Sequence, residues 1–214
     1  MVMVRRPLGR GCLIPPALRV DHHPSPVKKD QRFVDASRYE ARGALKDGRT
    51  VTIRSICPDD KSTVRAAFHR LSAQSVYRRF FSPKQTLTEA DLKWITEVDF
   101  EKTVALVIEL HEGHTRTLIG GGRYVEYDSK ETVRTAELAF TVRDDFQGKG
   151  IGKLLMQHLT IIGRAKGVAR FEANVLAENR GMLGVFAASG LPMRTENLGG
   201  ELRVTLSLEG AKSF

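Results

Sequence analysis

The chain has 214 residues, which is enough for one ordinary domain with or without a tail. Hydrophobic residues make up 41% of it and charged residues 28%, which excludes a chain that is mostly disordered. The formal net charge is +9, but residues 1–38 hold eight Lys and Arg against three Asp and Glu, so the remainder is only mildly basic and is not patterned for nucleic acid.

Cysteine usage and hydropathy limit the class of protein further. Cys12 and Cys57 lie far apart and follow no metal-ligand spacing, which predicts neither a disulfide framework nor a metal site. The sequence contains no run of about 18 apolar residues, so it predicts no membrane-spanning helix. We therefore expect a cytoplasmic protein without a membrane partner.

The chain divides into two parts. Residues 1–38 contain five of the eight prolines and show no sustained helix or strand period, so we expect a basic tail that is disordered or draped over the surface. The hydrophobic pattern tightens from about residue 48. We expect one folded domain over residues 48–208.

The elements of this domain follow from local patterns. Residues 50–56 alternate and are β-branched, as in a strand. Thr88 and Asp91 resemble a capping box, and apolar side chains recur at helical spacing over residues 150–166. The predicted elements are strand 50–56, helices 58–71 and 88–98, strands 103–110, 117–126 and 133–142, helix 150–166, strand 169–176, helix 179–189 and strand 201–208. This order predicts a mixed α/β fold, and the glycine run at 120–122 predicts a bulge or a close backbone approach.

A glycine-rich turn over residues 147–152 lies between a predicted strand and the long helix. Its three glycines let the backbone approach a ligand closely, and a helix N-terminus offers unpaired N–H groups and a positive dipole end. These features predict a pyrophosphate site, with a turn that merely starts the helix as the alternative. The spacing is neither G-x-x-x-x-G-K-[ST] nor G-x-G-x-x-G, which disfavours a P-loop triphosphatase and a dinucleotide-binding fold.

Residues 136–152 (AELAFTVRDDFQGKGIG) resemble the central motif of the GNAT superfamily of N-acetyltransferases. The pattern Gln/Arg-x-x-Gly-x-Gly/Ala is met by Gln147, Gly150 and Gly152. Residues 177–191 resemble the second motif of the family, and residues 71–81 resemble its bacterial Pat-type protein lysine acetyltransferases. The resemblance covers about residues 48–208 and implies an acyl-CoA N-acyltransferase fold with splayed central strands.

The same resemblance implies acetyl-CoA as the donor and no metal. The backbone of one strand would pair with the pantetheine arm, the loop amides would hold the pyrophosphate, and an asparagine side chain would meet the arm. The residues in these roles are, in order, Phe140, Thr141 and Val142; Gln147, Gly148, Lys149, Gly150, Ile151 and Gly152; and Asn179.

Glu137 is the candidate catalytic residue. Attack on a thioester needs a neutral amine, and a lysine amine, with a pKa near 10.4, is mostly charged at neutral pH, so a base must remove a proton. Glu137 shares a strand face with Ala139 and Thr141, and burial between apolar neighbours would raise the pKa of its carboxyl group. It matches the general-base position of histone- and Pat-type relatives, and a structural carboxylate paired with an arginine is the alternative.

Phe186 stands where many relatives have a tyrosine that protonates the leaving thiolate, so the general acid is left open. The expected function is acetyl transfer from acetyl-CoA to a primary amine, either a protein lysine or a small molecule. A non-catalytic acetyl-CoA-binding regulatory module is the alternative, and a nucleic-acid or membrane-surface protein acting through the basic tail is a third hypothesis. The sequence does not select the acceptor, and a homodimer is compatible with it.

Overall fold

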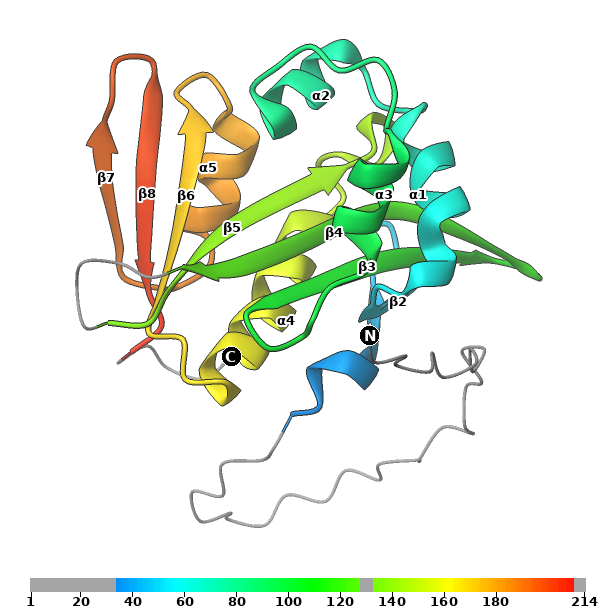
Figure 1. Cartoon of the computed structure of the whole chain (residues 1–214), viewed down its shortest axis with the longest axis horizontal. Helices are drawn as coiled ribbons and strands as arrows, with labels where there is room; N and C mark the ends of the chain where they lie inside the picture. The colour runs from blue at the N-terminus through cyan, green and yellow to red at the C-terminus, as the bar shows by residue number, and fades with distance from the viewer. Residues whose placement is uncertain (1–33, 128–132, 210–214) are drawn as a thin grey trace, which may run out of the picture. The chain divides into compact units, whose positions relative to one another are not determined.

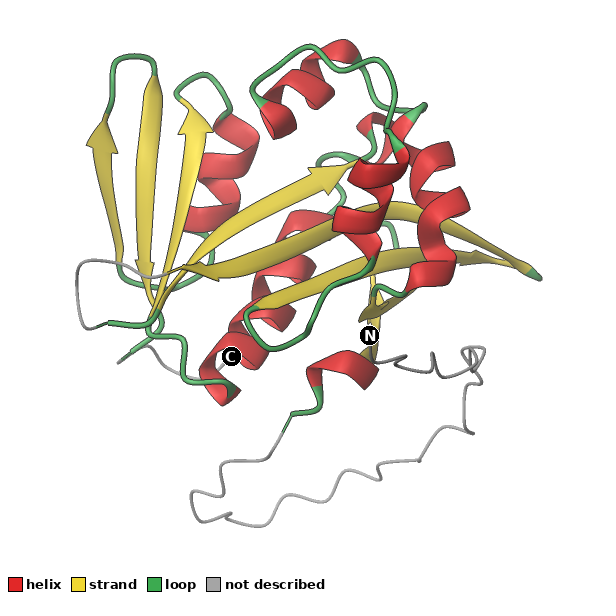
Figure 2. Ribbon diagram, viewed as in Figure 1, coloured by secondary structure: helices red, strands yellow, loops and turns green. Residues whose placement is uncertain are grey.

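The computed structural model describes residues 34–127 and 133–209, which form one eight-stranded sheet with helices on both faces (Figures 1 and 2). The strand order is β1-β2-β3-β4-β5-β6-β8-β7, and every neighbouring pair is antiparallel except β5 and β6. The strands are β1 (Glu40–Ala44), β2 (Thr50–Ser55), β3 (Thr103–Glu112), β4 (Thr115–Tyr127), β5 (Thr135–Val142), β6 (Arg170–Leu176), β7 (Met193–Asn197) and β8 (Glu201–Ser207). The α-helices are α1 (Lys61–Phe68), α2 (Ala73–Phe80), α3 (Glu89–Thr96), α4 (Ile151–Ala165) and α5 (Arg180–Ala187).

The main core lies between the sheet and α4. Ile151, Leu155, Leu159 and Ile162 recur at helical spacing and are almost completely buried, which confirms the predicted apolar face of this helix. They pack with side chains of β3, β4, β5 and β6 in one contiguous cluster. The long helix therefore holds the central strands together and fixes the loop that precedes it.

Helices α1 and α3 cover the opposite face of the sheet. Phe68 and Leu92 are buried between the helices, whereas Ile56, Ala105 and Val107 form a smaller apolar cluster on the sheet side. Figure 1 shows α1 and α3 over β3 and β4, with α2 beyond the end of β5. These helices thus build a second layer next to the free part of β5.

The glycine run in β4 has both predicted properties. The register of β3 and β4 shifts between Ile108 and Glu109, opposite the start of the run. A Cβ on Gly122 would lie 2.6 Å from Cδ1 of Phe140, and one on Gly120 would lie 2.9 Å from Cγ2 of Ile151. The bulge and the close backbone approach are therefore confirmed, because α4 and β5 pack directly on this stretch.

Two strands and one α-helix of the described chain were not predicted from its sequence, namely β1, β7 and α2. Strand β1 pairs with β2, and Ala36 before it is 4% exposed, so the ordered chain begins before residue 48 and includes the last part of the stretch assigned to the tail. Strand β7 is exposed along its whole length and shows no alternation. Residues 1–33 lie outside the described residues, and no helix of the described part is long and apolar enough to cross a membrane.

Candidate active site

The groove that holds the candidate site opens where β5 and β6 separate. The parallel pairing of the two strands covers only Thr135 to Glu137 on β5 and Arg170 to Glu172 on β6. Beyond these pairs the strands diverge, as Figure 1 shows, and the rest of β5 faces a groove of about 650 Å³. The backbone of β5 on this side is available to pair with an extended ligand, because β6 no longer does so.

The loop at the end of this groove has the geometry of an anion site. Gly148 and Gly150 have φ values of +75° and +96°, which side chains other than glycine rarely adopt. The amides of residues 148–153 donate to no backbone carbonyl of the described residues, and α4 starts at Ile151 without a side-chain cap. Unpaired N–H groups at the positive end of a 15-residue helix favour a phosphate ligand.

Gly152 has a different role from the other two glycines of the loop. A Cβ there would lie 2.8 Å from Cγ2 of Val185, so Gly152 is needed for the packing of α4 on α5. The loop therefore uses two glycines for its turn and one for helix packing, a division that the spacing of the motif alone does not reveal.

Most of the predicted cofactor residues face the groove together. Those that line it are Phe140, Thr141, Val142, Gln147, Gly148, Gly150, Ile151, Gly152 and Asn179. Lys149 does not: its Nζ lies 3.9 Å from Oδ2 of Asp47 and 5.0 Å from the centre of the Phe146 ring. Its charge is therefore held beside Asp47, and its contribution to the loop is its backbone.

Other cations, which were not predicted from the sequence, line the groove instead. Lys46 comes from the β1–β2 hairpin, and its backbone amide donates to the Lys149 carbonyl at 3.0 Å. Lys153 lies on the first turn of α4, and Arg78 comes from α2 with a buried Nε that has no hydrogen-bond partner among the described residues. Only a prediction of the hairpin and of α2 could have placed Lys46 and Arg78 here.

Asn179 and Phe186 lie on the α5 side of the groove. The Asn179 side chain caps α5 by accepting a hydrogen bond from the Met182 amide at 3.2 Å, which leaves its Nδ2 for a ligand. Phe186 is 1% exposed and packs against Phe140 with ring centroids 6.4 Å apart. The described lining residues include no tyrosine, cysteine or histidine.

Glu137 lines the groove, but its environment differs from the expected one. Its side chain is exposed, because it lies at the last β5–β6 pair, where the groove opens. The predicted desolvation of its carboxyl group is therefore wrong. Glu172 is its direct neighbour on β6, where it accepts a hydrogen bond from the Tyr127 hydroxyl at 2.8 Å.

A polar network ties α2 to the loop before α4. The Asp144 carboxylate accepts hydrogen bonds from the Ser72 amide at 2.9 Å, the Ser72 hydroxyl at 2.9 Å and the Ser75 hydroxyl at 2.7 Å. Burial raises the pKa of Asp144, but these hydrogen bonds outweigh it and leave the pKa below its usual value. The Gln147 side chain donates to the Ser75 hydroxyl at 3.1 Å, so it helps to position α2 as well as to line the groove.

Comparison with known proteins connects this geometry to a family. Residues 70–191 match the model of the Acetyltransferase (GNAT) family. The chain is 34% identical over 155 residues to acetyltransferase Pat of Mycolicibacterium smegmatis; the match covers 72% of this chain and 45% of the relative. It is 30% identical over 147 residues to acetyltransferase PA5475 of Pseudomonas aeruginosa, covering 69% of this chain and 77% of that one.

Among solved structures, the GNAT domain of S. lividans PAT superposes with a TM-score of 0.69 at 30% identity. The superposition covers 78% of this chain and 96% of that domain. This chain thus spans less than half the length of the mycobacterial relative, while it matches nearly the whole of the S. lividans GNAT domain.

Proposed function

This chain belongs to the GNAT acetyltransferase family, and we propose that it moves the acetyl group of acetyl-CoA to a primary amine with Glu137 as the general base. The observation that supports the proposal is the position of Glu137. Its carboxylate lines the same groove as the amide-rich loop before α4, and the free part of β5 runs between the two. One groove therefore combines an anion site, an unpaired strand and a base.

The residues of this groove fit acetyl-CoA, which supplies an acyl group activated as a thioester. The amides of residues 148–153 and the cations Lys46, Lys153 and Arg78 suit its phosphates. The β5 backbone from Phe140 to Val142 suits the amide-containing arm, and Nδ2 of Asn179 can donate a hydrogen bond to it.

The role of Glu137 follows from its exposure. Its exposed carboxylate can accept a proton from an incoming ammonium group, either directly or through one water. Deprotonation makes the amine nucleophilic, and the groove positions it toward the acetyl group. The chain's own residues thus contribute to the reaction in two ways: Glu137 removes a proton from the acceptor amine, and the groove positions that amine.

Because Phe186 stands where a tyrosine could donate a proton, the leaving sulfur needs another proton donor. It is buried against Phe140 and has no proton to donate, and the described groove lining offers no tyrosine in its place. We propose that water, or the proton released by the amine, protonates the thiolate. The low intrinsic pKa of a thiol, about 8.5, makes strong acid assistance unnecessary.

The test is incubation of the full chain with acetyl-CoA and a panel of primary amines, with release of free thiol as the readout. We expect thiol release that depends on both the amine and the enzyme. Binding of acetyl-CoA in a calorimeter without turnover of any amine would overturn the proposal and support a non-catalytic acetyl-CoA-binding module.

A further inference from the structure

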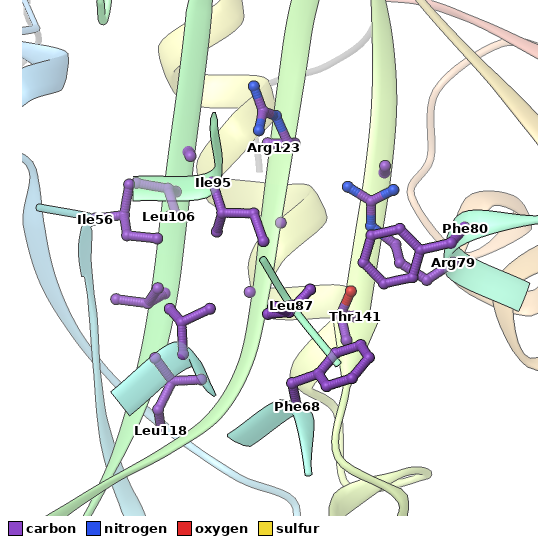
Figure 3. A pocket seen from close by; sticks show the side chains of 16 residues that line it. Ile56, Phe68, Arg79, Phe80, Leu87, Ile95, Leu106, Leu118, Arg123 and Thr141 are labelled. Carbon is purple, nitrogen blue, oxygen red and sulfur yellow. The ribbon is translucent and has the colours of Figure 1, made fainter. Parts of the chain in front are cut away.

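A second, smaller cavity adjoins the groove on the side of the helical layer. It has a volume of about 110 Å³ and lies between the helices and strands β3, β4 and β5 (Figure 3). Its walls are mostly apolar, with Phe68, Leu87, Ile95 and Leu118 among them. It shares four lining residues with the main groove, so the two spaces are adjacent; these are Arg79, Phe80, Ala139 and Thr141.

Two arginines enter this apolar space without a carboxylate partner among the described residues. Arg79 comes from α2 and Arg123 from β4, and Figure 3 shows both guanidinium groups toward the same end of the cavity. Arg123 is 8% exposed; its Nη1 donates to the Trp94 carbonyl at 3.1 Å, its guanidinium lies 3.7 Å from the centre of the Trp94 ring, and its Nε has no partner in the described part of the chain. No carboxylate of the described residues forms an ion pair with either arginine.

The contrast with Arg54 shows that this arrangement is unusual within the fold. Arg54, on β2, is paired with both Asp60 and Glu109, at 2.7 and 2.5 Å. Buried charges in proteins are normally compensated in this way, since an unpaired one is costly. The two cavity arginines lack such compensation from the described residues.

Electrostatics in the cavity favour an anion. Burial, together with repulsion by Arg79, lowers the pKa of Arg123 to about 10. Burial also lowers the pKa of Arg79, and attraction by Glu137 offsets this only in part. Arginine side chains keep their proton in proteins, so the cavity holds two like charges, and an incoming anion would reduce their repulsion.

We propose that the acceptor amine carries a carboxylate, which this cavity binds between Arg79 and Arg123. The inference rests on the proposed acetyl transfer and names its substrate class: a small amino acid with few carbons between the amine and the carboxylate. Guanidinium groups match a carboxylate in a planar, bidentate geometry. A volume of about 110 Å³ admits a carboxylate with a short carbon chain and little more.

The register of the sheet places the base at a fitting separation. Arg123 is directly opposite Ala139, and Glu137 lies two residues further along β5 on the same face. Two residues of a strand span about 7 Å. An amine at Glu137 and a carboxylate at the arginines therefore belong to one short molecule.

A lysine side chain of a peptide fits the cavity less well. It would bring an alkyl chain and an ammonium group toward two guanidinium groups that form no ion pair within the described residues, and these groups repel a cation. A protein lysine is therefore the competing outcome of the test and not the proposal.

The test compares matched acceptors that differ only in the anion: glycine with glycinamide, β-alanine with β-alaninamide, and γ-aminobutyrate with its amide. A lysine-containing peptide is added to the panel. We expect the carboxylate member of at least one pair to have a kcat/KM roughly tenfold to hundredfold higher, as for a charge-assisted hydrogen-bonded pair. Arg123→Gln and, separately, Arg79→Gln should abolish the preference without changing acetyl-CoA affinity, and Arg42→Gln on the exposed surface of β1 is the control.

The failures of the two proposals are distinguishable. Turnover of amides and acids at equal rates, or a preference that survives both arginine variants, overturns the anion site while the acetyl transfer stands. No turnover of any amine overturns the proposed function. In that case thermal melts with sodium propionate at constant ionic strength decide about the cavity: a rise in Tm that Arg123→Gln abolishes supports it, and no rise refutes it.

Discussion

Glu137, the proposed general base, faces solvent at the last residue pair that joins β5 to β6. The strand period sets its face, because Ala139 and Thr141, which line the groove with it, follow at intervals of two. The separation of β5 from β6 sets its exposure. As the proposed base, Glu137 would act by its proximity to the acceptor amine.

We predict that Glu137→Gln lowers the rate at neutral pH by roughly 10²–10⁴, the usual loss for a general base. The affinity for acetyl-CoA should not change, because the loop amides lie elsewhere in the groove. The rate should recover in part as pH rises, since more of the acceptor amine is then already neutral. Steady-state rates against pH, with calorimetric acetyl-CoA binding, check this; a folded variant with the parent's rate at neutral pH would show that Glu137 is not the base.

Gly150, in the loop before α4, has a left-handed backbone conformation. Its φ of +96° is strained for any branched residue, although the nearest atom to an added Cβ, Cγ of Lys46, is 3.5 Å away. Gly150→Val should therefore act by straining the loop backbone, and not by a steric clash of the new side chain. We expect acetyl-CoA affinity, measured by calorimetry, to fall by about tenfold or more, which corresponds to about 1.4 kcal/mol.

The matched control for Gly150→Val is Gly113→Val in the β3–β4 hairpin. Gly113 also has a positive φ, +59°, and no atom lies within 4 Å of the position that an added Cβ would take. This variant should lose a comparable free energy of unfolding, about 1–2 kcal/mol, and keep its acetyl-CoA affinity. Equal affinity losses in both variants would mean that general destabilisation, and not the loop, is responsible.

At the scale of elements, α2 is held in place by a neighbour far away in sequence. The helix is short and amphipathic, and its start at Ser72 is fixed by Asp144, next to the glycine-rich loop before α4. The helix in turn brings Arg78, Arg79 and Phe80 to the groove. The proposed acceptor and cofactor sites are therefore linked through the Asp144 carboxylate.

We predict that acid weakens this link. The pKa of Asp144 is lower in the folded chain than the usual value of about 3.9, so its stabilisation is complete above that value and is lost as pH falls through the folded pKa. Asp144→Asn should lower Tm and raise the KM for the acceptor at neutral pH, and its Tm deficit should shrink as the pH falls below about 4. Melting curves against pH measure this.

Asp145→Asn is the control from the same turn, because Asp145 pairs with Arg143 at 2.6 Å and makes no hydrogen bond to α2 within the described part of the chain. It should leave the acceptor KM unchanged. An equal rise of KM in both variants would refute the specific link between Asp144 and α2.

For the whole molecule, the gap between β5 and β6 divides the sheet into two parts. Strands β1 to β5 form one part and β6, β8 and β7 continue the sheet beyond the groove, while side chains from both parts share the core that contains α4. Strand β1 belongs to the first part and pairs with β2. The segment before it is fixed by the hydrogen bond from the Ser55 hydroxyl to the Ala36 carbonyl at 2.6 Å. We propose that the catalytic domain starts near residue 34.

Two truncations test this boundary. Removal of residues 1–33 should leave Tm and acetyl transfer unchanged, whereas removal of residues 1–47 should lower both, because it deletes an edge strand, the buried Ala36 and the groove-lining Lys46. Circular dichroism melts and thiol-release rates are the measurements. A large loss on removing residues 1–33 alone would assign them to the working domain.

Local patterns in the sequence were sufficient for the loop before α4, the apolar face of that helix and the strand face of Glu137. These features depend on periods of two or 3.6 residues and on the conformational freedom of glycine, which neighbouring residues reveal by themselves. They predicted the fold class and most of the groove. They did not predict β1, α2 or β7, which are short and whose positions depend on pairing and capping by distant segments.

Tertiary structure alone decided how charge is distributed around the site. It turned Lys149 toward Asp47, brought Lys46 and Arg78 to the groove, and exposed Glu137. It also placed Arg79 and Arg123 in one cavity, although they lie on different elements. The physical reason is that the energy of a charge depends on which groups and how much solvent surround it in space, and folding determines both.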